Sequence, residues 1–347
     1  MSVPRLPLVQ RRLRSDRAPA LFRLVRGVLF VSLRLPWSLT EIVQLWRLFR
    51  RTQPDVLHIN NGGFPGAWTC TLAAIAGKCA RIPVIVYAVH NLAVPYDRNP
   101  SRWLDWPFDR ATVGVTSMFI TGSRAAGEAL SGVLRLGSAQ LRVIPNAIEN
   151  PRPDAGPGAG IDLGGGPILL VIARLEARKG HAVLLRALDR LRREGLQLPT
   201  VLFAGDGPER SKVEALIEEF DLSASVTLLG EYPHCGELLK LVDALVLPSI
   251  EDEDFPLCIV EAMEAECAVV ATAVGGVPEQ LVDGVSGYLV PPGDDGALAK
   301  ALVQCIEDPD RRSAVAAAAN IRFHELFEPD VLVRRYLDLY AGLLKSV

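Results

Sequence analysis

The sequence lacks the cysteine patterns of metal sites and disulfide scaffolds. Its 347 residues include only six cysteines, and none forms a CxxC pair or another spacing typical of zinc sites. Most of the six stand in apolar runs, which predicts reduced thiols in the core of a cytoplasmic protein. A catalytic triad, a metal-ligand cluster, a Walker loop and a repeat of solenoid period are also missing from the pattern. The function must therefore be sought in other motifs.

The sequence has no long uninterrupted apolar segment either. The best candidate, residues 18–35, is broken by Arg23, Arg26 and Arg34, whereas a membrane span needs about 20 mostly apolar residues. A signal peptide is not predicted, because the apolar run 27–33 is short and no small-residue cleavage site follows it. The three arginines share one helical face, which fits a helix lying in a membrane interface and equally a core helix with one solvated stripe.

Charge is distributed unevenly along a chain whose net charge is only -3. Residues 1–53 hold eleven arginines against Asp16 and Glu41, a balance of +9, so the rest of the chain carries -12. This basic segment predicts peripheral contact with an anionic partner such as a membrane face, while nucleic acid is not the expected partner. A solvated basic helix explains the segment equally well.

Strand-like and helix-like segments alternate in two blocks, which predicts parallel sheets with helices on both faces. A capping box at Ser38–Glu41 predicts a helix that ends before Pro54. The Pro- and Gly-rich stretch 150–166 reads as a linker. We therefore expect an N-terminal domain over 1–150, a C-terminal domain over 167–325 and a terminal helix within 326–347. The predicted strands are 55–59 (buried), 83–89, 117–121 and 142–144, then 168–173, 200–204, 226–229, 244–247 and 269–272.

The segment from Pro248 to Met263 carries the most informative pattern. Glu253 and Glu261 stand eight positions apart, after an apolar strand and around the start of a helix whose first residue we expect to be Pro256. Unpaired amides at a helix start attract anions, and carboxylates accept hydrogen bonds from hydroxyls. The pattern therefore predicts a receptor for a sugar nucleotide.

This spacing resembles the Glu-x7-Glu motif of the GT4 family (glycosyl transferases group 1), retaining enzymes with the GT-B fold. The resemblance implies an α/β protein with two doubly wound Rossmann-like domains facing a cleft, and a terminal helix that packs back toward the N-terminal domain. The family's first strand and glycine loop have no counterpart before Asp55, so either the N-terminal domain is reduced or the sequence starts late. Four further segments match in the family's order: 173–180, 204–208, 270–279 and 283–290.

The resemblance implies a role for each matched residue. Arg174 and Lys179 would be the basic pair at the donor diphosphate, although an Arg and a Lys near a turn are ordinarily just solvated. Glu253 would face the donor sugar, and Glu261 would bind the ribose hydroxyls. The segment at the start of the following helix, Phe255, Pro256 and Leu257, would supply backbone amides to the sugar and phosphate.

His90 follows a strand of the first block, at the sheet edge where ligands bind in open α/β folds. The resemblance implies that it faces the reacting sugar across the cleft, and a structural histidine is the alternative. His58 is expected only to cap its strand, and Asp206 to bond backbone amides in a turn. The catalytic set implied is thus His90, Arg174, Lys179 and Glu253.

No metal or cofactor is expected beyond the UDP- or GDP-linked donor. The alternative is that Asp252-Glu253-Asp254 forms an Asp-x-Asp pair, which holds a divalent cation in transferases of another fold. We weigh it lightly, because a basic pair already serves the phosphates.

The implied function is transfer of a sugar from a nucleotide-sugar donor to a glycan acceptor. We expect a lipid-linked acceptor, a place in cell-surface polysaccharide or glycolipid synthesis, and a cytoplasmic enzyme peripheral to the inner membrane face. The alternative is a catalytically impaired GT-B protein that acts as a binding or assembly subunit. A GT-B epimerase or phosphorylase is a third option.

Overall fold

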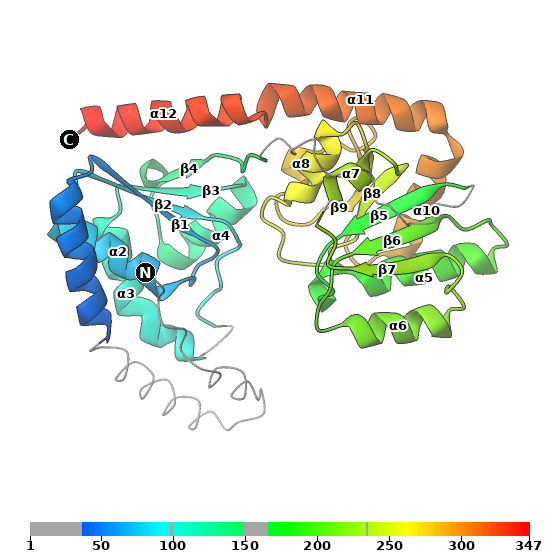
Figure 1. Ribbon diagram of the computed structural model, residues 1–347, viewed down its shortest axis with the longest axis horizontal. Helices are drawn as coiled ribbons and strands as arrows, with labels where there is room; N and C mark the ends of the chain where they lie inside the picture. The colour runs from blue at the N-terminus through cyan, green and yellow to red at the C-terminus, as the bar shows by residue number, and fades with distance from the viewer. Residues whose placement is uncertain (1–36, 98–99, 149–165, 234) are drawn as a thin grey trace.

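Two parallel β-sheets, each with helices on both faces, make up the protein (Figure 1). The computed structural model describes residues 37–97, 100–148, 166–233 and 235–347. The basic segment up to residue 36, with its proposed interfacial helix, and most of the expected linker lie outside the described residues. The α/β architecture expected from the alternating pattern is confirmed.

Among the described residues, the N-terminal sheet has four strands in the order β1-β2-β3-β4. They are β1 (Val56–Asn61), β2 (Val84–Val89), β3 (Met118–Thr121) and β4 (Leu141–Val143). All four predicted strands are present, but the prediction that the first is buried is wrong. In the described sheet β1 pairs only with β2, so it is an edge strand, and its His58 and Asn60 are exposed.

Helices cover the faces of this sheet. Residues 37–52 are helical and end before Pro54 as predicted. The predicted capping box is wrong, because Ser38 lies inside the helix and is buried, and its Oγ accepts a hydrogen bond from Trp68 Nε1 at 2.9 Å. The elements that follow are α2 (Trp68–Cys79), η1 (Pro100–Asp105), α3 (Trp106–Val115), α4 (Arg124–Leu134) and η2 (Ser138–Gln140).

The C-terminal sheet has six strands in the order β10-β9-β8-β5-β6-β7. Its strands are β5 (Ile168–Ile172), β6 (Thr200–Ala204), β7 (Val226–Gly230), β8 (Ala244–Leu247), β9 (Ala268–Thr272) and β10 (Tyr288–Val290). The sequence predicts the first five and misses β10. From β5 the chain adds β6 and β7 on one side and then β8, β9 and β10 on the other. The direction therefore reverses between β5 and β8, and ligands bind in the crevice at the carboxyl ends of two such strands.

Apolar clusters fill both faces of the C-terminal sheet. Leu184 and Leu302 belong to the cluster under α5 and α10, and Ile259 and Phe323 to the cluster under α8 and α11. The helices of this half are η3 (Ala177–Lys179), α5 (His181–Arg193), α6 (Arg210–Glu219), α7 (Cys235–Leu239), α8 (Leu257–Glu264), α9 (Val277–Gln280), α10 (Asp295–Glu307) and α11 (Pro309–Leu326).

The last helix, α12 (Pro329–Lys345), leaves the C-terminal half and lies along the N-terminal sheet (Figure 1). Leu332, which is 1% exposed, packs in one cluster with Val84 and Val86 of β2. Tyr336 and Tyr340 join the edge of that cluster. The N-terminal half is therefore completed by the end of the chain.

All six cysteines are free thiols, yet the expectation of core thiols holds only for Cys267 and Cys305. Cys79 is exposed, and the other three are half-buried. Within the part of the chain that the structure describes, no helix has the length and the hydropathy of a membrane span.

Candidate active site

The predicted donor residues come from two loops that touch at the crevice between β5 and β8. Gly180 sits in the left-handed region with φ of 70°, and a Cβ atom there would lie 1.8 Å from the carbonyl oxygen of Pro248. Only glycine permits this approach. The contact brings the loop after β5 against the loop after β8.

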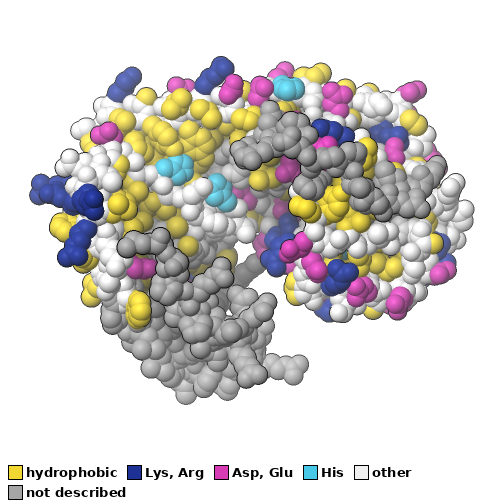
Figure 2. Space-filling model, in the orientation of Figure 1, with side chains coloured by type: hydrophobic (Ala, Val, Ile, Leu, Met, Phe, Trp, Pro, Cys, Tyr) yellow, Lys and Arg dark blue, Asp and Glu magenta, His cyan; other side chains and the backbone are white. Residues whose placement is uncertain are grey.

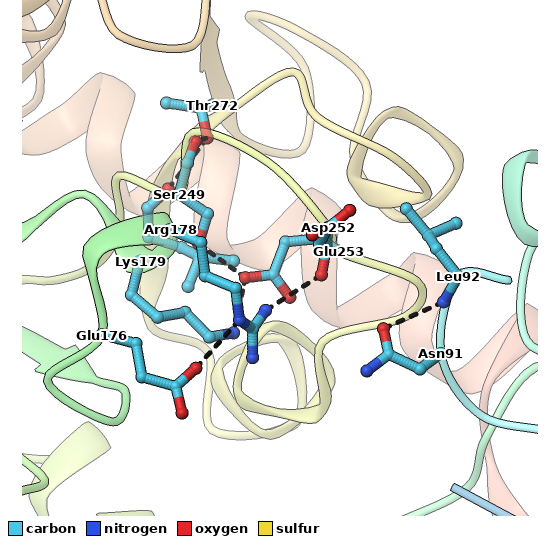
Figure 3. Close-up of polar contacts among 10 residues, drawn as sticks. Asn91, Leu92, Glu176, Arg178, Lys179, Ser249, Asp252, Glu253 and Thr272 are labelled. Atoms are coloured by element: carbon cyan, nitrogen blue, oxygen red, sulfur yellow. Dashed lines mark hydrogen bonds and ion pairs between the residues drawn. The ribbon is translucent and has the colours of Figure 1, made fainter. Parts of the chain in front are cut away.

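Lys179 and Glu253 meet where these loops touch (Figure 3). Lys179 Nζ lies 2.6 Å from Glu253 Oε1, and the two side chains are 15% and 6% exposed. Ser249 Oγ donates to the same carboxylate oxygen at 2.6 Å. The hydroxyl of Thr272 in turn donates to the Ser249 carbonyl oxygen. The structure thus brings together two predicted catalytic residues and fixes the carboxylate from two sides.

Arg174 does not join this pair. Its side chain is 71% exposed and forms an ion pair with Glu176 at 2.8 Å. Arg178, which sequence reasoning passed over, lies nearer the cluster: it pairs with the other Glu176 oxygen at 2.9 Å and donates to the Asp252 carbonyl oxygen at 3.0 Å. The predicted basic pair is therefore separated, with Lys179 inside the site and Arg174 at its edge.

The helix after Glu253 begins one residue later than predicted. Pro256 occupies the N-cap position and α8 starts at Leu257, because Pro256 has an extended backbone with ψ of 117°. Phe255 is buried and packs edge-to-face on Phe327, whereas Leu257 is 40% exposed. The amides of the first turn of α8 have no partner within the helix and can bind an anion.

Glu261 stands one turn further along α8. Burial, and then the neighbouring Glu264 carboxylate, raise the pKa of Glu261 above its ordinary range. Among the contacts of the described residues, none joins the Glu261 carboxylate to a hydrogen-bond or ion-pair partner. A half-buried carboxylate of this kind is suited to accept hydrogen bonds from ligand hydroxyls.

His90 follows β2 and approaches the donor loop from the N-terminal half. Its Nε2 is hydrogen-bonded to Asn60 Oδ1. It lines a cavity of about 490 Å³ together with Phe255 and Leu257 of the donor loop. Asn91 and Leu92, the residues after His90, lie across from Asp252 and Glu253 (Figure 3). The structure therefore places the predicted histidine opposite the predicted donor site.

Two carboxylates of the C-terminal half hold the start of α4 in the N-terminal half. Asp254 Oδ1 accepts a hydrogen bond from Ser123 Oγ at 2.6 Å, with both residues buried. Glu279 accepts from the backbone N–H groups of Arg124 and Ala125 at 2.8 and 3.0 Å. We call these contacts the latch. They join the two halves directly beside Glu253.

The structure also shows the hydrogen-bond partners of Asp206, His58 and Asp254. Asp206 Oδ1 accepts from the Gly207 N–H at 2.7 Å, so the predicted turn bond is confirmed. The prediction that His58 caps its strand is wrong: it lies within β1, and its Nδ1 is hydrogen-bonded to the Tyr340 hydroxyl. Asp254 points to Ser123, and no group of three potential metal ligands is present among the described residues.

The sequence did not point to roles for Arg178, Ser249 and Ser123, and it offered Asp254 only as a metal ligand, not as a partner of Ser123. Ser249 had a usable signal, since it follows a predicted strand by two positions and so stands at the ligand-binding edge of the sheet. The pairing of Ser123 with Asp254 spans 131 positions of sequence, and no local pattern points to it.

The chain matches two family models in sequence order. Residues 6–150 match the model described as "Glycosyltransferase Family 4", and residues 162–322 match "Glycosyl transferases group 1". A glycogen synthase from Mycobacterium tuberculosis is 30% identical over 84% of this chain and 70% of its own length. The chain belongs to the GT4 glycosyltransferases. A 2-deoxystreptamine glucosyltransferase from Streptomyces kanamyceticus is 27% identical to this transferase over 88% of the chain and 83% of the relative.

A solved structure supports the fold of this transferase. The Anabaena protein Alr3699/HepE in complex with UDP superposes with a TM-score of 0.72 at 21% identity, covering 87% of this chain and 82% of its own. The transferase therefore has the GT-B fold, as expected from its sequence.

Proposed function

We propose that the transferase moves a sugar from a UDP-linked donor to a hydroxyl of a lipid-linked acceptor, with retention of configuration and without a metal. The observation that carries this proposal is the arrangement of the crevice. Lys179, the start of α8 and Glu261 gather on one side, and His90 lines a cavity on the other. That is the arrangement required to hold a nucleotide sugar against an acceptor.

The charge of each residue determines which part of the donor it would bind. The Lys179 ammonium and the first amides of α8 would stabilise the charge that develops on the leaving diphosphate. Glu253 would accept hydrogen bonds from the donor sugar, and Glu261 from the ribose. The bond from the anomeric carbon to the phosphate oxygen breaks, the acceptor oxygen forms the new bond on the same face, and the acceptor proton passes to the departing phosphate. His90 would orient the reacting sugar.

The choice of UDP is supported by relatives. Alr3699/HepE is described in complexes with UDP and with UDP-glucose. Because that protein is only 21–22% identical to this chain, its ligand enters here as a proposal.

A place at the inner face of a membrane is supported by the exposed side chains of the N-terminal half. Trp37, Trp103 and Trp106 are 73%, 61% and 48% exposed. Exposed Arg47 and Arg50 stand on the same helix as Trp37. Tryptophan and arginine together favour the interface of an anionic membrane, and a membrane-bound acceptor would be a lipid-linked glycan of the cell surface.

The decisive experiment compares two neutral substitutions on α8. Glu261→Gln is expected to weaken UDP binding by about 10- to 100-fold, because a charged hydrogen bond contributes about 1.5–3 kcal/mol. Glu264→Gln is the matched control, since Glu264 lies on the same helix and burial also raises its pKa. Calorimetric titration with UDP measures both.

Turnover is tested separately with a panel of UDP- and GDP-sugars. Release of UDP from one of them supports the transferase proposal. Equal UDP affinity in both variants would refute the assignment of Glu261. Tight UDP binding with no turnover on any sugar, with or without an acceptor, would favour an impaired GT-B subunit.

A further inference from the structure

The cavity that His90 lines has a wall on α12, outside the proposed donor site. Its volume of about 490 Å³ falls within the range of roughly 300–1,000 Å³ that is usual for ligand pockets. One side is formed by Phe255 and Leu257 at the start of α8, one by His90 after β2, and one by residues 145–147 after β4. The remaining wall is the first half of α12. Its lining residues are His90, Pro145, Asn146, Ala147, Phe255, Leu257, Leu332, Val333 and Tyr336.

The lining is mostly apolar. Polar side-chain atoms come only from His90, Asn146 and the hydroxyl of Tyr336 among the residues that line it. Burial, and then Tyr340, raise the pKa of Tyr336 to about 12, so its hydroxyl stays neutral. Figure 2 shows the setting: hydrophobic side chains gather over the part of α12 that lies on the N-terminal half, with histidines beside them.

We propose that this cavity receives the hydrocarbon chain of the acceptor, with α12 as one wall, and that the hydroxyl to be glycosylated lies at the His90 end. This inference rests on the proposed function and deepens it, because it names the acceptor class and the element that selects it. An acceptor here is amphiphilic: a saturated or isoprenoid chain joined to a group that carries the reacting hydroxyl.

The chemistry of the lining selects a chain over a second sugar ring. Every hydroxyl of a buried sugar needs a hydrogen-bond partner, and an unpaired one is costly. Beyond His90 and Asn146 the cavity offers few partners, whereas each methylene buried in it would contribute favourably. The polar end lies beside Phe255 and Leu257, which flank the donor site, so a chain seated against Val333 leaves its head group at the point of transfer.

Val333 provides the test, and Leu337 provides its control. Val333 lines the cavity and is 53% exposed, so a charge there is not expected to unfold the protein. Leu337 is 59% exposed on the same helix one turn later and does not belong to the lining. Val333→Glu and Leu337→Glu therefore place the same charge inside and outside the cavity. Val333→Arg is a second variant with the opposite charge.

The probes are methyl, butyl, hexyl and octyl β-D-glucosides, used below the concentration at which they form micelles. Their binding to the full chain in the presence of UDP is measured by calorimetry. In the unmodified protein and in Leu337→Glu, affinity is expected to rise about fourfold per methylene, which corresponds to about 0.8 kcal/mol per buried CH₂, until the cavity is filled. In Val333→Glu and Val333→Arg the dependence on chain length is expected to disappear, while UDP affinity stays unchanged.

Two results would overturn the inference: no dependence on chain length in the unmodified protein, or the same dependence in the Val333 variants. UDP binding is recorded in the same titrations and distinguishes the two proposals. A chain-length dependence without any binding of UDP would leave the cavity assignment standing and refute the donor site. UDP binding without chain-length dependence would support the donor site and refute the cavity assignment.

Discussion

The two opposite charges where the donor loops touch, on Lys179 and Glu253, hold one another until a ligand enters. Lys179 and Glu253 neutralise one another at 2.6 Å with little exposure to water, and Ser249 supplies a further hydrogen bond. A diphosphate would therefore have to draw the ammonium away from Glu253, which would free the carboxylate for the hydroxyls of the sugar. A single exchange of partners would thus make Lys179 available to the diphosphate and Glu253 available to the sugar.

The ion pair between Lys179 and Glu253 also contributes to the stability of the fold. Lys179→Met leaves the Glu253 carboxylate buried without its counter-charge, and we expect it to lower the free energy of unfolding by about 2–3 kcal/mol, less than for a fully buried pair because Lys179 is 15% exposed. Urea unfolding measures the loss. The double variant Lys179→Met/Glu253→Gln is expected to recover most of it. Equal losses in the single and double variants would show that the loss does not come from the unpaired Glu253 carboxylate.

The buried imidazole of His181 makes the stability of the fold depend on pH. His181 is 3% exposed, and neither ring nitrogen has a hydrogen-bond partner among the described residues. Burial, and then Lys179, lower the pKa of His181 from 6.5 to about 4. Because the unfolded chain binds the proton first, the contribution of His181 to stability is present above pH 6.5 and is lost as the pH falls toward 4. The loss amounts to about 2.5 kcal/mol at pH 4.5.

His181→Leu removes this titration and keeps an apolar contact with Phe203, on which the imidazole now packs. We therefore expect the difference in unfolding free energy between pH 7 and pH 4.5 to be smaller in the variant by about 2.5 kcal/mol. Denaturant midpoints at the two pH values check it. An identical pH dependence would mean that His181 takes up its proton in the folded protein.

The sequence predicts which residues form the site better than it predicts their partners. Residues Glu253, Glu261 and Lys179 could be identified because motif spacing depends on local geometry at strand ends and helix starts. That Arg174 pairs with Glu176, leaving Lys179 alone with Glu253, depends on side-chain competition in three dimensions. Spacing carries no information on that competition.

At the scale of the element, the turn at Gly180 decides whether the two donor loops can touch. Gly180→Ala would place a Cβ 1.8 Å from the Pro248 carbonyl oxygen, so one loop must move. We expect a loss of more than about 3 kcal/mol in unfolding free energy or, if the loops separate, a loss of UDP affinity.

Gly195→Ala is the matched control for this prediction. Its φ of 77° is close to the 70° of Gly180, yet a Cβ there would meet nothing within 4 Å. It should show only the cost of the left-handed backbone, about 1 kcal/mol. Thermal unfolding and UDP titration of both variants check the difference. Similar effects of the two substitutions would mean that the close approach is unimportant.

Elements were predicted well where the pattern was long and apolar. Nine strands follow from runs of β-branched and aliphatic residues, including the three-residue β4. Strand β10 is equally short and is followed at once by Pro291 and Pro292, which read as a loop. The burial of β1 could not be predicted correctly, because its sequence does not show that, within the described part of the chain, the strand has a neighbour on one side only. The capping box at Ser38 fails because Trp68, far along the chain, takes its hydroxyl.

At the scale of the whole molecule, the latch controls how the two halves meet. Glu279 accepts hydrogen bonds from the start of α4, and Ser123 and Asp254 add a buried bond beside it. We expect Glu279→Ala to increase the radius of gyration measured by small-angle scattering and to lower the rate of UDP-sugar turnover, because the halves separate more readily.

Asp294→Ala is the control for the latch. Asp294 also accepts a hydrogen bond from the start of a helix, the N–H of Ala297 at 2.8 Å, but within the C-terminal half. It should lower stability by about 1 kcal/mol without changing the radius of gyration. An unchanged radius in Glu279→Ala as well would mean that other contacts hold the halves together.

The course of α12 also determines when the N-terminal sheet can be covered during synthesis. Strand β2 emerges early from the ribosome, but the residues that cover Val84 and Val86 belong to the last 19 of the 347 residues, from Pro329 onward. The C-terminal sheet has all its strands by Val290 and can form before them. In the nascent chain the N-terminal sheet therefore keeps this apolar surface open until the C-terminal half, through Phe327 of its core, and then α12 have been made. Chaperones that hold exposed hydrophobic surface would act on the first-made half.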